Sequence, residues 1–399
     1  MLGTKILHPG STVSANISET VMTITPLRQA LSRRAFFDAA LGAAALTASA
    51  ARGAAAAAQN PAGDLRTLAA ARNLLFGAAA VSRVLSGDRA MAAVYAREVG
   101  MIVPDFEMKW AVVRPDRSTY NCGGADALAR FASEHGLRLR GHCLAWEESN
   151  PAWLAEAATP HTAERILVDH VERMVSRYAG RVHSWDVVNE PVWPDHRQPG
   201  GLRDGVWLRT LGPRYIDIAF RAARAADPGA MLVLNEAGTE VTSPFGRRRR
   251  QDFLALLDRL KNDQVPVDAV GLECHLSTKA QFDRQDFADY LSALAGRGYK
   301  ILISELDVSD FDEPSPDIAV RDRAVARIYQ DLVSVAVNEP AVVAIVTWEL
   351  SDKYTWLRDA NLTSQYRRAD GLPARPLPYD DLLQKKACWS AIARALAPA

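Results

Sequence analysis

The chain has 399 residues, of which 48% are hydrophobic, and its 47 basic residues balance its 47 acidic residues. This neutral total excludes a general polyanion binder, and a chain of this length buries a sizeable core. A single domain is still compatible with the length, because α/β barrels often run past about 250 residues.

The first predicted element is an export signal. Arg33 and Arg34 precede an apolar run at residues 39–51, which is too short to span a bilayer. An arginine pair before a modest apolar run is the twin-arginine export pattern. We therefore expect residues 1–58 to be an export signal and disordered N-terminal segment, with a periplasmic or extracellular mature protein and no membrane anchor. The alternative is an alanine-rich helix of the folded domain.

From residue 59 to residue 399, short apolar runs alternate with amphipathic helical patterns, and no linker divides them. The predicted strands cover residues 76–81, 99–103, 137–142, 182–188, 231–234, 269–272, 300–304 and 342–347. Helices are predicted at residues 162–178, 214–226, 251–260 and 321–337. Eight strand–helix repeats predict an α/β fold, a (β/α)₈ TIM barrel that forms one domain over residues 59–399.

Four consecutive arginines stand at residues 247–250, near the start of a predicted helix. The run is isolated, and acidic residues elsewhere offset its charge. We interpret it as a solvated helix end and expect no nucleic-acid partner.

The four cysteines contain no CxxC pair, which removes support for a zinc ribbon or a thioredoxin-like site. Cys143 and Cys274 lie within apolar, strand-like runs. We expect buried free thiols, although the even count leaves one or two disulfides open.

Polar and aromatic side chains gather where the predicted strands end. These residues are His142 with Trp146, Asn189 with Glu190, Asn235 with Glu236, His275, Glu305 with Asp307, and Trp348. In a (β/α)₈ barrel the carboxyl ends of all strands surround one mouth, where active sites lie. We therefore expect these residues to converge although they are far apart in the sequence.

Two of these residues, Glu190 and Glu305, suit the hydrolysis of glycosidic bonds by paired carboxyl groups. Glu190 is the candidate acid/base, which must hold a proton near neutral pH, and a nearby ionised Glu305 would favour this. Glu305 is the candidate nucleophile. Retaining enzymes hold the two carboxyl groups about 5–5.5 Å apart. The sequence predicts that the pair converges and leaves the separation open.

Other strand-end residues have supporting roles in this interpretation. Asn189 is placed to donate to the 2-hydroxyl of the sugar, a contact that strengthens in the transition state. His275 and Asp307 are placed to orient and stabilise Glu305. Trp348 and Trp356 offer apolar platforms for sugar faces.

Two segments resemble those that carry the acid/base and the nucleophile in glycoside hydrolase family 10, the endo-β-1,4-xylanases. They are WDVVNEP at residues 185–191 and ISELDV at residues 303–308, and RGHxLxW precedes them at residues 140–146. The likeness runs from about residue 65 to residue 392. The resemblance implies endo-acting retaining hydrolysis of xylan, with no cofactor and no metal, by a monomer whose partner is the polysaccharide. Residues that it places around the sugars are Lys109, His142, Trp146, Asn189, His275, Trp348 and Trp356.

The sequence departs from the family pattern near the sugars. Asp105 and Phe106 replace a Glu-Asn pair that binds a sugar on the non-reducing side, and Phe106 lacks the amide. Glu147 replaces a common histidine, and Glu273 replaces the usual glutamine. A second carboxyl group beside Glu305 is expected to raise one of the two coupled pKa values.

The same loop region contains one further departure and leaves alternative functions open. Asn235-Glu236-Ala237-Gly238 replaces Asn-Asp-Tyr-Asn, which removes an aromatic contact. A related β-1,4-glycanase with altered subsite preference is one alternative. A carbohydrate-binding barrel without catalysis is another, although the presence of both glutamates argues against it. A metal enzyme built on His142, His275, Glu305 and Asp307 is a third, but no HExxH spacing supports it.

Overall fold

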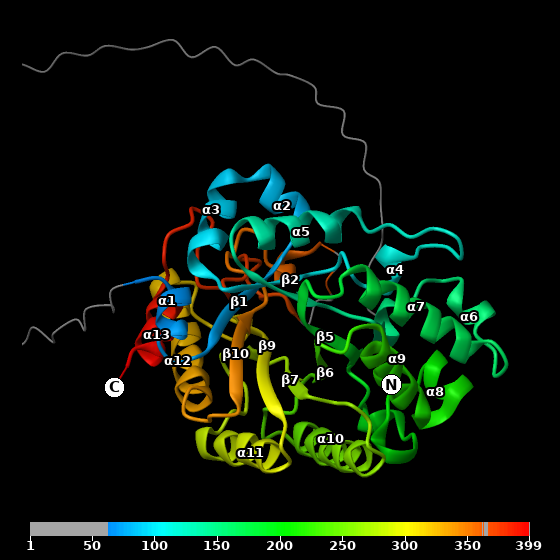
Figure 1. Cartoon of the computed structure of the whole chain (residues 1–399). Helices are drawn as coiled ribbons and strands as arrows, with labels where there is room; N and C mark the ends of the chain where they lie inside the picture. The colour runs from blue at the N-terminus through cyan, green and yellow to red at the C-terminus, as the bar shows by residue number, and fades with distance from the viewer. Residues whose placement is uncertain (1–62, 361, 363–365, 399) are drawn as a thin grey trace, which may run out of the picture. The chain divides into compact units, whose positions relative to one another are not determined.

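Parallel strands close into a barrel in the computed structural model, which describes residues 63–360, 362 and 366–398. Its eight strands are β1 (Leu75–Ala80), β2 (Met101–Pro104), β3 (Arg138–Gly141), β5 (Val182–Asn189), β6 (Met231–Glu236), β7 (Ala269–Leu272), β9 (Lys300–Ser309) and β10 (Val342–Thr347). β10 pairs with both β1 and β9, so the ring is complete within the described part of the chain. The predicted (β/α)₈ barrel is confirmed (Figure 1).

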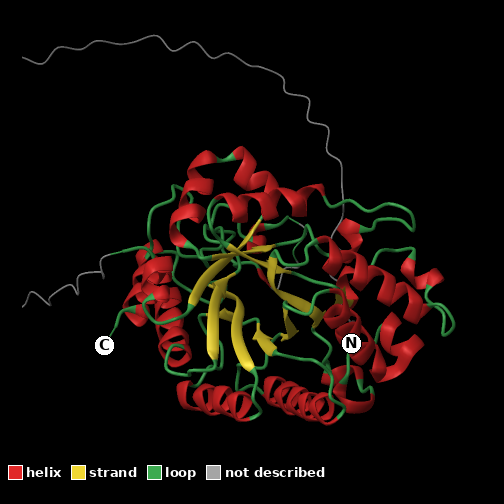
Figure 2. Ribbon diagram, viewed as in Figure 1, coloured by secondary structure: helices red, strands yellow, loops and turns green. Residues whose placement is uncertain are grey.

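Helices surround the strands on the outside of the barrel (Figure 2). The longer ones are α3 (Arg89–Glu98), α5 (Gly123–Glu134), α7 (Ala163–Arg177), α9 (Tyr215–Ala226), α10 (Pro244–Asn262), α11 (Arg284–Gly296), α12 (Ile318–Ala336) and α13 (Ala387–Leu396). The shorter ones are α1 (Leu65–Ala70), α2 (Ser82–Gly87), α4 (Trp110–Val113), α6 (Leu154–Ala157) and α8 (Val206–Leu211). None of the helices in the described residues is long and apolar enough to cross a membrane.

Helix α10 begins seven residues before the predicted start at residue 251. The hydroxyl of Ser243 caps it by accepting from the Gly246 N–H at 3.1 Å, and Pro244 occupies the first turn. The arginine run therefore lies inside the helix, and the expectation of a solvated helix end is wrong for Arg249. That side chain is buried because it shares the inner face of the helix with Phe253 and the leucines that follow.

The barrel has apolar layers on both faces of its strands. Since successive side chains of a strand point to opposite faces, Leu302 fills the barrel interior while Ile301 and Ile303 pack outward against the helices. The interior layer consists of Ala79, Met101, Val103, Val233, Ala269, Leu302, Ala344, Val346 and Trp348. This packed layer supports the mouth of the barrel from below.

The two ends of the described chain meet on the outside of the barrel, where α1 lies beside α13 (Figure 1). Arg72 donates to the carbonyl of Leu396 at 2.9 Å and to that of Ala397 at 2.5 Å. The buried carboxylate of Glu98 also joins the ends, because it accepts from the Leu65 N–H at 3.2 Å and from the Trp389 indole at 3.0 Å.

All four cysteines are free and buried, so the expected thiols are confirmed. The expected export segment at residues 1–58 lies outside the described residues, and the domain boundary at residue 59 stays a prediction.

Candidate active site

Both candidate glutamates lie at the mouth of the barrel, one directly after its strand and the other within a strand that continues past the barrel. Glu190 directly follows β5 and turns away from the strand with φ of 48°, while its N–H donates to the carbonyl of Asn235 at 2.9 Å. Glu305 lies within β9, and its N–H donates to the carbonyl of Glu273 at 3.1 Å. The ladder of the barrel thus fixes the backbone beneath each carboxyl group.

The amide of Asn235 links three strand ends across the mouth. Its Nδ2 lies 2.7 Å from Oδ1 of Asn189, 2.8 Å from Oε1 of Glu305 and 3.1 Å from Oε1 of Glu273. Its Oδ1 accepts from the hydroxyl of Ser304 at 2.7 Å, which fixes the orientation of the amide. Asn189, the neighbour of Glu190, is therefore held in one network with Glu305.

His275, Asp307 and Trp356 hold the nucleophile candidate from one side. Nε2 of His275 lies 3.4 Å from Oε2 of Glu305, and its Nδ1 lies 3.0 Å from Oδ1 of Asp307. The indole of Trp356 donates to Oδ2 of Asp307 at 2.7 Å. Asp307 thus orients His275, which in turn contacts Glu305.

The charges of this group favour an ionised Glu305. Burial would lower the pKa of His275, but the carboxylates of Asp307 and Glu305 raise it well above its ordinary value. Burial would raise the pKa of Glu305, but the charges of His142 and His275 hold it below its ordinary value. An ionised carboxylate is the form that attacks an anomeric carbon.

A buried charge network below the mouth completes the nucleophile side. Nδ1 of His142 lies 2.8 Å from Asp186 and 3.8 Å from Oε1 of Glu305. Arg140 donates to the other oxygen of Asp186 at 2.5 Å and to the Ser304 carbonyl at 3.3 Å. The sequence reasoning did not assign Arg140 or Asp186. Their signal was a pair of opposite charges inside two apolar strands, since buried charges need partners.

Aromatic side chains and one lysine extend the site away from Glu305. The ammonium of Lys109 lies 5.0 Å from the ring centre of Trp146 and 5.7 Å from that of Trp348. His142 meets Trp348 edge-on at 5.2 Å, and His275 meets Trp356 edge-on at 5.4 Å. The structure therefore brings every residue that the sequence placed around the sugars into one connected group.

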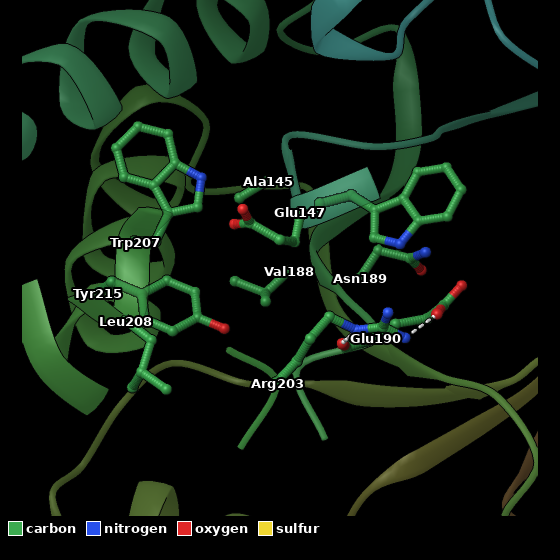
Figure 3. Close-up of a pocket in the computed structure, with 10 residues that line it drawn as sticks. Ala145, Glu147, Val188, Asn189, Glu190, Arg203, Trp207, Leu208 and Tyr215 are labelled. Carbon is green, nitrogen blue, oxygen red and sulfur yellow. Dashed lines mark hydrogen bonds and ion pairs between the residues drawn. The ribbon is translucent and has the colours of Figure 1, made fainter. Parts of the chain in front are cut away.

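Two arginines that the sequence reasoning missed hold Glu190. Arg203 pairs with Oε2 of Glu190 (Figure 3). It also donates to Glu148 at 2.6 Å. Arg249 lies 3.7 Å from the same Glu190 oxygen and 2.5 Å from Oε1 of Glu236. Arg203 lies in an irregular segment with no sequence signal. Arg249 had one, because residues 249, 253, 256, 257 and 260 repeat with helical spacing and all are buried.

Glu273 adds a third carboxyl group between the other two. Burial and the charges of Glu305 and Glu190 raise its pKa well above the ordinary value, in agreement with the expectation for a second carboxyl group beside the nucleophile. Of the two neighbouring carboxyl groups, Glu273 therefore favours the protonated form and Glu305 the ionised form.

Two sets of side chains at the mouth have the donor types that bind divalent cations. They are His142, Asp186 and Glu305, and Glu273, His275 and Glu305. Within each set the imidazole nitrogens are already directed at carboxylate oxygens.

The profile of glycosyl hydrolase family 10 matches residues 64–395. The chain belongs to glycosyl hydrolase family 10. Among its relatives, endo-1,4-beta-xylanase C of Phanerodontia chrysosporium is 33% identical over 297 residues, covering 73% of this chain and 71% of that one. Endo-1,4-beta-xylanase B of Thermotoga neapolitana is 31% identical over 333 residues, covering 82% and 90%.

Solved structures agree with this family 10 assignment. Native xylanase 10B from Thermotoga maritima matches with a TM-score of 0.75 and 31% identity, covering 84% of this chain and 98% of that one. Xylanase 10B from Thermotoga petrophila RKU-1, solved in complex with xylobiose, also has a TM-score of 0.75 and 31% identity, with 85% and 98% covered. The similarity therefore extends over the whole barrel of the family 10 chain.

Proposed function

We propose that this family 10 protein is an endo-acting retaining hydrolase of the β-1,4-xylosidic bonds of xylan. The observation that carries the proposal is the network in which Asn235 joins Glu305 to Asn189, directly beside Glu190. Family membership and the relatives named as endo-1,4-beta-xylanases support the substrate.

The reaction would proceed by double displacement. Glu305 attacks the anomeric carbon while Glu190 protonates the departing glycosidic oxygen, which gives a covalent glycosyl-enzyme. Glu305 then carries no charge, and Glu190 takes a proton from the water that breaks the ester bond. His275 and Asn235 would hold the Glu305 carboxylate in place through both steps.

The sugar on the non-reducing side would lie among Lys109, Trp146, Trp348 and Trp356. Lys109 is the charged member, and its ammonium is 3.9 Å from Asp105. Phe106, which stands where the family has an amide, would make this subsite more apolar than in relatives.

We also propose that the chain is exported as a monomer by the twin-arginine route. The arginine pair at residues 33 and 34 and the apolar run after it support this. Expression of the full chain with Arg33→Lys and Arg34→Lys tests it, because loss of enzyme from the periplasm and medium is expected. Unchanged export would overturn the route, and a mass measurement by light scattering tests the monomer.

The decisive experiment follows the products of xylan hydrolysis by proton NMR. The first product should have the β-anomeric configuration of the substrate bond. Glu190→Ala should lose far more activity on xylan than on aryl xylosides with good leaving groups, which need no protonation. Glu305→Ala should be inactive on both, and added azide should not restore the retained product. The assignment would be refuted if the protein left xylan intact or gave a product of inverted configuration. It would also be refuted if Glu190→Ala lost equal activity on xylan and on the aryl xylosides.

A further inference from the structure

Glu190 is the middle member of a row of alternating charges on the acid/base side of the mouth. The order along the row is Glu148, Arg203, Glu190, Arg249 and Glu236. The nitrogen–oxygen separations are 2.6 Å from Arg203 to Glu148, 3.7 Å from Arg249 to Glu190 and 2.5 Å from Arg249 to Glu236. Both guanidinium groups are therefore shared between Glu190 and another carboxyl group.

The row is mostly shielded from water. The side chains of Arg203 and Arg249 are 6% and 4% exposed, that of Glu236 is fully buried, and that of Glu148 is 31% exposed. In such surroundings a net charge is costly, so the number of protons follows the balance of the fixed charges.

The balance in this row requires one proton. Guanidinium groups stay charged at every working pH, so Arg203 and Arg249 supply two positive charges. Three ionised carboxylates would exceed them by one, and one proton on Glu148, Glu190 or Glu236 restores neutrality. Two carboxylates and two guanidinium groups would need no proton.

Other carboxyl groups also face the two arginines or Glu190. Burial raises the pKa of Glu147, which lines the pocket beside Arg203, and the pKa of Glu240, which interacts with Arg249, so both favour the neutral form. Burial and the charges of Glu305 and Glu190 raise the pKa of Glu273, which follows β7, so this carboxyl group favours its neutral form. Glu305, on β9, is matched by His275 at 3.4 Å. The surplus of one carboxyl group thus belongs to the row itself.

We propose that Glu148, Glu190 and Glu236 share one proton across Arg203 and Arg249, and that Glu148 and Glu236 are positioning residues that keep this proton available to Glu190. The inference rests on the proposed role of Glu190 as the general acid. Burial raises the pKa of Glu236 to about 7, and burial together with the charge of Glu190 raises the pKa of Glu148. An ionised Glu148 or Glu236 repels a second negative charge, which favours the protonated form of Glu190 as the pH rises.

The test removes one carboxyl group at a time with Glu148→Gln and Glu236→Gln. In each variant the remaining carboxylates match the two guanidinium groups, so Glu190 loses its proton at a lower pH. The alkaline limb of kcat/KM on xylan should move down by about one pH unit, while the acidic part of the profile stays at the wild-type level. With an aryl xyloside that has a good leaving group, the limb should not move.

Two features of this experiment distinguish the effect of removing a charge from the effect of a folding defect. Glu236 accepts from the Val192 N–H at 3.0 Å, so its variant risks a folding defect, whereas Glu148 is partly exposed and gives an independent reading. The control is Glu164→Gln, which breaks an exposed glutamate–arginine pair with Arg214 away from the row and should leave the profile unchanged.

The outcomes also separate this inference from the proposed function. An unmoved alkaline limb in Glu148→Gln and in Glu236→Gln, with the leaving-group dependence of Glu190→Ala intact, would overturn the shared proton and leave Glu190 as the acid. A limb that moves equally on xylan and on the aryl xyloside would also overturn it. Absence of the leaving-group dependence in Glu190→Ala would overturn Glu190 as the acid.

Discussion

Asn235 has a single amide nitrogen facing three oxygen acceptors, one each from Asn189, Glu305 and Glu273. An amide nitrogen has two protons, so the three contacts compete. In the proposed mechanism, attack by Glu305 removes its charge and weakens its hold on this nitrogen, which frees a proton for Asn189 or Glu273. The amide is thus suited to follow the change of charge during the reaction.

We expect Asn235→Ala to lower kcat by about 100-fold, the usual cost of removing one preorganised donor from a reacting group. KM should change much less, because the amide contacts the protein rather than a remote sugar. Steady-state kinetics on xylan, with circular dichroism to check folding, measure both constants. A higher KM with unchanged kcat would assign Asn235 to binding instead.

The positive charge on His275 is expected to determine the pH at which the acidic limb of the kcat/KM profile lies. Burial would raise the pKa of Glu305, but the charges of His142 and His275 hold it below its ordinary value, so the carboxylate of this proposed nucleophile persists to low pH. In His275→Gln one of these charges is lost, the pKa of Glu305 rises, and the acidic limb of kcat/KM should move to higher pH. Substitution of the exposed His161 by Gln is the control, and equal profiles for the two variants would contradict the expectation.

Much of the site was predictable at this scale, because residues at strand ends converge wherever a parallel barrel closes. Glu190, Glu305, Asn189 and His275 all follow from that rule. Arg203 and Glu148 did not, because Arg203 lies in a loop and Glu148 in a one-turn 3₁₀ helix, and the paths of both segments depend on tertiary contacts.

At the scale of elements, β7 must carry a glycine where it passes the amide of Asn235 on β6. A β-carbon added to Gly271 would lie 1.9 Å from Oδ1 of Asn235 and 3.2 Å from the hydroxyl of Ser304. Both atoms belong to the network that orients Glu305. The missing side chain therefore makes room for the polar network between these strands.

Gly271→Ala should displace the Asn235 amide and reduce kcat at least about 10-fold, with a loss of stability of about 1–3 kcal/mol for overpacking. Kinetics and urea unfolding measure the two effects. The matched control is Gly296→Ala at the end of α11, where an added β-carbon meets nothing within 4 Å. If the two variants had the same kcat and the same free energy of unfolding, β6 and β7 would move apart without loss of stability, and the expectation would be wrong.

Strand positions were predictable because each is a run of buried apolar residues between helices, and β7 and β10 have the bounds that the sequence indicated. Two short strands, β4 (Ala145–Trp146) and β8 (His275–Ser277), were not predicted. They are too short to show a period of two, and they form only because β5 and β9 extend beyond the barrel to pair with them.

At the scale of the whole molecule, Glu98 secures the closure of the barrel. Its carboxylate is fully buried and accepts from Leu65, Trp389 and the hydroxyl of Tyr379, the last at 2.7 Å. These partners come from the first helix, the last helix and the segment before it. One side chain on α3 therefore connects both ends of the described chain to the body of the barrel.

Glu98→Ala should lower the free energy of unfolding by about 3 kcal/mol or more, since several buried donors lose their acceptor. Urea unfolding measures the change, with Glu134→Ala on the exposed end of α5 as the control. Activity per folded molecule should be unchanged, because Glu98 is outside the mouth. A loss no greater than that of the control would show that water replaces the carboxylate.

The closure of the barrel was predictable from the number of strand–helix repeats, because eight such repeats are typical of a closed (β/α)₈ barrel. The contacts of Glu98 were not predictable, since nothing in the sequence around residue 98 indicates which distant donors it meets. The proposed export signal lies outside the described residues, and its experiment is independent of the barrel.

The bonds from Arg72 to the carbonyls of Leu396 and Ala397 place the beginning and the end of the barrel within one side chain's reach. A short peptide linker would therefore connect them without disturbing a strand, and the chain could be cut open at an exposed loop instead. Such a circular permutant would have its new termini at that loop and should keep the spatial order of the strands in the barrel.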